Sequence, residues 1–150
     1  MSEIAMPDLK QRPPRSPRVR LGGFVILPRM LDKGRAELAG KNGEYHYNCP
    51  LDQHWVKFAG VNPDALLAEL KMGKGDGEIL EWITANSAHT LAAHEILAWS
   101  DYQDKRGPTD LEQREFYYDL HAQLAPHRKD LSSWFDVLDL DDFVSYGGKA

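Results

Sequence analysis

The sequence of 150 residues has one cysteine, Cys49. A single thiol cannot form an intramolecular disulfide, so a disulfide-stapled secreted protein is excluded and a reducing compartment is favoured. Long apolar runs are also lacking: the wholly apolar stretches span only a few residues, whereas a membrane helix needs ~20. The N-terminus is polar and proline-rich and has no signal-peptide core. We therefore expect a soluble, cytoplasmic protein with no membrane association.

Positive charge is scarce outside the first third of the chain. The formal net charge is -5, which argues against general affinity for nucleic acids, and no aromatic residue precedes Phe24 to stack on a base. Residues 1–41 carry nine Lys or Arg against four Asp or Glu, whereas residues 42–150 carry nine against nineteen. We expect no nucleic-acid partner, and we expect the basic part to dock on the acidic body of its own chain or on an acidic partner. The acidic stretch that could receive it contains Asp130, Asp136, Asp139, Asp141 and Asp142.

Internal repeats are absent as well, which excludes a fibrous protein. Four prolines in residues 1–23 predict an extended, basic, proline-rich arm. Residues 24–150 are predicted to form a helical domain, because apolar residues recur at helical spacing between cap signals such as Asn62-Pro63-Asp64, Thr109-Asp110-Leu111-Glu112 and Ser133. The predicted fold class is all-α, a compact single domain of six to seven short helices. Only residues 43–49, GEYHYNC, alternate weakly, and they predict extended chain or one small hairpin.

Several segments of the sequence resemble a known family. They are PPRSPRVRLGGFVILPRMLDKGRAELAG, GEYHYNCPLDQ, FAGVNPDALL and GDGEILEW, with Trp82 and Trp99. Together they resemble the bacterial domain-of-unknown-function family 5069, most densely over residues 13–83. The resemblance implies a bacterial, soluble, single-domain protein. It supplies no functional residues.

A candidate ligand site lies between residues 29 and 54. Arg29, Asp32 and Lys33 share one line of a predicted helix, and the next loop and helix start hold Tyr45, Tyr47, Asp52 and His54. If the loop folds back on the helix, Arg29 and Lys33 could hold an anionic ligand. Asp52 and His54 could then transfer protons. The competing interpretation is an intrahelical Arg29–Asp32 ion pair with the tyrosines packing the loop.

Other chemical motifs are incomplete. His46, Cys49 and His54 are too few for structural zinc, and His94-Glu95 is followed by Ala98 where a metalloprotease needs histidine. We therefore expect no metal and no cofactor. Cys49 is either a nucleophile activated at a helix start or, as we favour, a small buried thiol. The glycine-rich residues 73–77 lack the phosphate-loop pattern and predict a helix boundary.

The sequence favours a binding or interaction domain without catalytic activity. The alternative is a small enzyme or an anionic-ligand-binding domain that uses the Arg29–His54 region. The expected partner is therefore a small anionic ligand or another protein, and the sequence does not decide whether the protein forms an oligomer. The aromatic run Phe116-Tyr117-Tyr118 must point in three directions around a helix, so one ring is either exposed or part of a subunit interface.

Overall fold

The computed structural model describes residues 6–150, which form seven α-helices and no β-strand within that range. This confirms the predicted all-α class. The helices are α1 (Leu27–Leu38), α2 (Pro50–Ala59), α3 (Pro63–Lys71), α4 (Asp76–Asn86), α5 (Ala93–Lys105), α6 (Leu111–Leu124) and α7 (Trp134–Ser145). Among the described residues, none of these helices is both long and apolar enough to cross a membrane.

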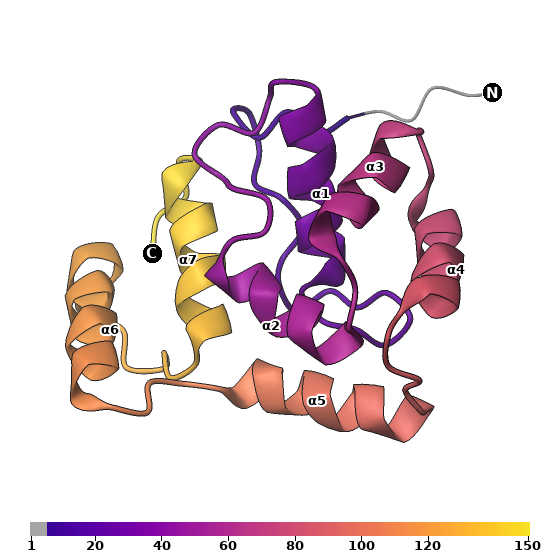
Figure 1. Ribbon diagram of the computed structural model, residues 1–150. Helices are drawn as coiled ribbons and strands as arrows, with labels where there is room; N and C mark the ends of the chain where they lie inside the picture. The colour runs from indigo at the N-terminus through magenta and orange to yellow at the C-terminus, as the bar shows by residue number, and fades with distance from the viewer. Residues whose placement is uncertain (1–5) are drawn as a thin grey trace.

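Helix α1 lies at the centre of the molecule (Figure 1). It packs against α2 and α3, α3 packs against α4, and α5 packs against α7. Helix α6 lies at the edge of the molecule, beside α7 (Figure 1). Of the three aromatic residues in sequence on α6, Tyr117 is buried, whereas Phe116 and Tyr118 are 63% and 65% exposed. The run therefore points in several directions, as expected from its spacing.

The core is built around α1, whose apolar residues are almost wholly buried. Its members from the other helices include Trp55, Leu66, Leu70, Ile79, Ile83 and Phe135. Gly34 is the point of closest approach: a Cβ there would lie 2.7 Å from Leu70 Cδ1 and 3.1 Å from Tyr47 Cδ2. The missing side chain therefore lets α3 and the tyrosine-bearing loop pack directly on α1. The first helix and residues 43–49 are thus neighbours, as the candidate site requires.

The predicted helix starts are correct at α3 and α7 and need correction at α4 and α6. The Asn62 side chain accepts hydrogen bonds at the start of α3, and Ser133 caps α7. At α6 the cap is Asp110 rather than Thr109, because the Asp110 carboxylate accepts from the Gln113 amide. Asp76 follows the glycine-rich boundary and its side chain could be expected to cap α4, but Asp76 is the first helical residue, and its carboxylate is held by two arginines.

Residues 43–49 were predicted to be either extended chain or one small hairpin, and the hairpin alternative is wrong. These residues form turns without β-pairing, and Asn48 has a left-handed backbone with φ 59°. The two tyrosines do not share a face as they would in a strand. The Tyr45 hydroxyl donates to Asp142 of α7 at 2.7 Å, and the Tyr47 hydroxyl donates to the Pro63 carbonyl at 2.6 Å. Tertiary hydrogen bonds, rather than a neighbouring strand, therefore fix this segment.

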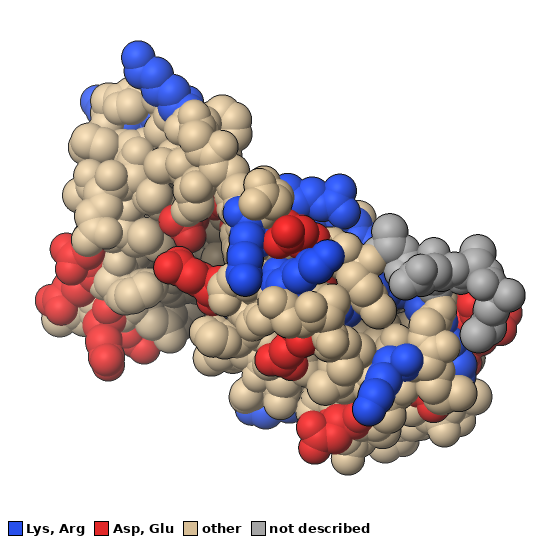
Figure 2. Space-filling model, turned by 90° about the horizontal axis from the view of Figure 1, so that it is seen from above, with Lys and Arg blue, Asp and Glu red and all other residues tan. Residues whose placement is uncertain are grey.

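The basic arm docks on its own chain, which confirms the first of the two alternatives for the charge asymmetry. The ion pairs join Arg15 to Asp32 and Asp76, Arg18 to Asp104, Asp136 and Asp139, and Arg20 to Asp101 and Asp104. Of the expected acidic stretch, Asp136 and Asp139 are the members that pair with the described part of the arm, residues 6–23. Basic and acidic side chains accordingly lie side by side on the face seen in Figure 2.

Acid is expected to weaken the contact between the arm and Asp76. Burial disfavours the Asp76 charge, but hydrogen bonds from Arg15 and Arg35 outweigh burial and hold the pKa of Asp76 below its ordinary value. Such a carboxylate stabilises the fold above its unfolded-state pKa of about 4, and this stabilisation is lost as the pH falls through the lower folded-state pKa. The unfolding temperature of Asp76→Asn should therefore lie below that of the wild type at neutral pH, and the two temperatures should converge in acid. An equal difference at every pH would contradict this.

Candidate functional site

A cavity of about 630 Å³ lies between the arm, α1, the loop that precedes α2, and α7. Leu9, Leu51 and Leu138 supply apolar wall. The polar side chains that line it are Lys10, Arg29, Lys33, Glu44, Tyr45, His46, Cys49, Asp141, Ser145 and Tyr146. The cavity therefore brings together Arg29, Lys33 and Tyr45 from the predicted site with residues from both ends of the chain.

Arg29 is buried and paired with Asp142. Its Nη1 lies 2.7 Å from Asp142 Oδ2, and its guanidinium lies 5.5 Å from the centre of the Tyr45 ring. Burial opposes the arginine charge, but the hydrogen bonds to Asp142 outweigh burial and raise the pKa of Arg29. Burial and the hydrogen bond to Asp142 also raise the pKa of Tyr45, so its phenol keeps its proton at neutral pH. The intrahelical Arg29–Asp32 pair does not form, because Asp32 accepts from Arg15.

Lys33 and Asp52 form a second buried pair, at 3% and 0% exposure. The Lys33 ammonium lies 2.9 Å from each carboxylate oxygen of Asp52 and 3.1 Å from Cys49 Sγ. Burial raises the pKa of Asp52 in spite of the lysine. Cys49 is half-buried and is the N-cap residue of α2, with Pro50 as the first helical residue. The pair thus ties the start of α2 to α1 at the cavity wall.

Four predicted site residues do not line the cavity: Asp52, which pairs with Lys33 behind the wall, and Asp32, Tyr47 and His54. Asp32 faces the arm. Tyr47 is half-buried against α3, and its partial burial raises the pKa of Tyr47. His54 keeps much of its surface exposed, and the partial burial of its ring, followed by the charges of Arg106 and Lys57, lowers the pKa of His54. Because Asp52 and His54 are two positions apart in α2, they point to different sides of the helix. The two residues expected to transfer protons are therefore separated.

The contribution of the C-terminal end to this site is not predicted by the sequence. The sequence suggests Asp141 and Asp142 only as acceptors for the arm, and it suggests no role in the site for Tyr146. Asp142 instead binds Arg29, and the Tyr146 hydroxyl donates to the Leu9 carbonyl. No local spacing signals these contacts, since Arg29 and Asp142 are 113 positions apart.

The described part of the chain contains no cluster of side chains suited to bind a metal ion. No group of three or more His, Cys, Asp or Glu side chains there could hold an ion. His46 and Cys49 both line the cavity, whereas His54 lies outside it.

Comparison with known proteins identifies the family of the chain. A search of proteins with curated functions found no match. The model of the family described as Domain of unknown function (DUF5069) matches residues 11–144, from the arm to the end of α7, and so extends the resemblance seen in residues 13–83. Because this match covers far more than half of the sequence, the chain belongs to the DUF5069 family.

Proposed function

We propose that this protein is a binding domain that holds one small molecule in the cavity between α1 and α7 and has no catalytic activity of its own. The observation that supports it best is the cavity itself. Its volume of about 630 Å³ is within the ~300–1,000 Å³ typical of small-molecule sites. Two buried ion pairs, Arg29–Asp142 and Lys33–Asp52, hold its wall in place before any ligand arrives. A preformed wall lowers the entropic cost of binding.

The contacts of the polar groups favour binding over catalysis. Both buried cations are already neutralised by carboxylates, and Tyr45 remains a protonated hydrogen-bond donor. Cys49 contacts Lys33, and no hydrogen bond of the described residues joins its thiol to a histidine base. An adjacent general base is one of the arrangements that activate a nucleophile for covalent catalysis.

A bacterial, cytoplasmic setting is part of the same proposal. The single thiol supports a reducing compartment, since the chain has no second cysteine with which Cys49 could pair.

A thermal-unfolding screen of the full chain against metabolites tests the proposal. A ligand at one hundred times its Kd should stabilise the fold by about 2.7 kcal/mol. Ser145→Trp places a bulky ring at the cavity wall and should abolish the stabilisation. Ala85→Trp, at an exposed position of α4 away from the cavity, should leave the stabilisation unchanged. The proposal is wrong if no compound stabilises the protein, or if Ser145→Trp leaves the stabilisation unchanged.

A further inference from the structure

The charges around the cavity do not favour an anion. The lining cations are Lys10, Arg29 and Lys33. Against them stand four carboxylates: two that line the cavity, Glu44 and Asp141, and two that pair with its buried cations, Asp52 and Asp142. The net charge is therefore negative. Arg29 and Lys33 are already neutralised by buried carboxylates, so an anion would compete at either cation with a carboxylate that is already in place.

Asp141 and Glu44 are the two carboxylates of the wall, and neither has an ion-pair partner among the described residues; Asp141 is the less exposed of the two. It is half-buried, and its one hydrogen bond is a long contact of 3.5 Å from the Ser145 hydroxyl. Burial, followed by the neighbouring charges of Asp142 and Glu44, raises its pKa. Arg29 is close enough to oppose this effect, but its guanidinium is bound to Asp142. An ammonium group entering the cavity would give Asp141 the partner that the protein does not supply.

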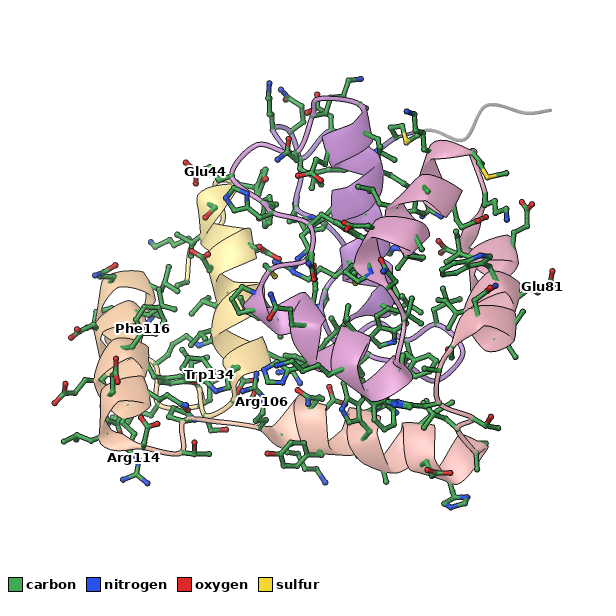
Figure 3. All side chains as sticks on the ribbon, in the orientation of Figure 1. Glu44, Glu81, Arg106, Arg114, Phe116 and Trp134 are labelled. Atoms are coloured by element: carbon green, nitrogen blue, oxygen red, sulfur yellow. The ribbon has the colours of Figure 1, made fainter. Side chains whose placement is uncertain are left out.

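The rest of the wall suits the carbon chain of such a ligand. Leu9, Leu51 and Leu138 supply apolar surface, and the rings of Tyr45 and Tyr146 line the same space. Aromatic faces attract cations, as the position of Arg29 over Tyr45 already shows. Figure 3 places the labelled Glu44 beside the C-terminal end of α7, so a second carboxylate stands near Asp141 at this side of the cavity.

We infer, on the basis of the proposed function, that the cavity binds a small organic amine whose ammonium group is held by Asp141 and Glu44. Lys10 is exposed and forms no ion pair among the described residues, so its ammonium competes for the same carboxylates. Lys10 therefore opposes amine binding, and Asp141 and Glu44 favour it. An anionic ligand would instead be favoured by Lys10 and opposed by the two carboxylates.

Three four-carbon probes of equal length and different charge separate these cases: putrescine, 1,4-butanediol and succinate. Spermidine serves as a longer amine. Calorimetric titration of the full chain should show binding of the amines and not of the diol or the diacid. Asp141→Asn should weaken amine binding about tenfold, and Lys10→Met should strengthen it. Glu81→Gln removes the same charge on the far side of the molecule (Figure 3) and should change nothing.

The outcomes distinguish this inference from the proposed function. If the amines do not bind, if succinate or butanediol binds as well as they do, or if Asp141→Asn has no effect, the amine assignment is overturned. The binding function still stands if a compound of another class stabilises the wild type but not Ser145→Trp. If no compound of any class does so, both fail.

The unfolding temperature of Asp141→Asn without ligand shows whether this variant is folded. Because the pKa of Asp141 is raised in the folded state, its ionised form is unfavourable there at neutral pH. Asp141→Asn should therefore unfold at a slightly higher temperature than the wild type without ligand, and this gain should vanish in acid, where the wild-type carboxyl is protonated. A lower unfolding temperature for Asp141→Asn at neutral pH would contradict this.

Discussion

Replacing Lys33 by methionine is expected to destabilise the protein by about 3–5 kcal/mol, because the Asp52 carboxylate would stay buried without its counter-ion. The loss should be smaller in acid, since protonation of Asp52 removes the uncompensated charge. The double variant Lys33→Met/Asp52→Leu should recover most of the stability, because it removes both charges from the interior. Urea unfolding of the three proteins measures these differences.

The matched control is the exposed pair between Arg128 and Asp130. Arg128→Met should leave the unfolding midpoint unchanged, since solvent screens an exposed ion pair. If Lys33→Met is as harmless as Arg128→Met, or if the double variant is less stable than Lys33→Met, the Lys33–Asp52 pair does not hold α1 and α2 together as described.

Deleting residues 1–20 is expected to produce the second large loss. Leu9 is 1% exposed, and burial of such a side chain contributes about 1.5–3 kcal/mol. The deletion also removes Arg15, Arg18 and Arg20, which join the arm to α1, α4, α5 and α7. Thermal unfolding of the shortened and full chains measures the effect. Equal unfolding temperatures would show that the arm is not needed for stability.

A triple variant separates the ionic part of this effect from the apolar part. Replacing Arg15, Arg18 and Arg20 by glutamine keeps Leu9 but removes the ion pairs. Its deficit should shrink at high salt, because screening weakens the partly exposed pairs of the wild type. The deletion should remain destabilised at every salt concentration, since salt does not restore the missing contacts of Leu9. A triple-variant deficit independent of salt would contradict an ionic role for the three arginines.

The local part of the fold could be predicted from the sequence because its signals are local. Leu27, Met30 and Leu31 recur at helical spacing and are all buried in α1. Asn62 and Ser133 cap the helices that they were expected to cap. These effects act within one or two turns of chain, so spacing alone predicts them.

Which residues form ion pairs and hydrogen bonds with one another could not be predicted in the same way. Arg29 has Asp32 one turn away, yet it binds Asp142, while Asp32 receives Arg15 from the arm. The reason is burial: an exposed intrahelical pair contributes little, whereas a buried arginine requires a carboxylate in hydrogen-bonding geometry. The alternation of Tyr45 and Tyr47 misled for a related reason, since each hydroxyl is fixed by a tertiary contact.

Part of the lining of the cavity consists of residues that the sequence analysis grouped together. Arg29, Lys33 and Tyr45 line one cavity, and Asp52 supports it from beneath Lys33. Asp141, Asp142 and Tyr146 complete the site from the opposite end of the sequence. Their part depends on how α7 packs beside the loop, which no periodicity in the chain encodes.

Labelling of Cys49 gives the most direct measurement of the binding cavity. Cys49 is the one thiol of the sequence, and it lines the cavity in a half-buried position. A thiol reagent such as a maleimide therefore reports on this place alone. A compound that stabilises the protein should slow the labelling in proportion to its occupancy. An unchanged labelling rate at saturating concentrations of that compound would show that the ligand binds elsewhere.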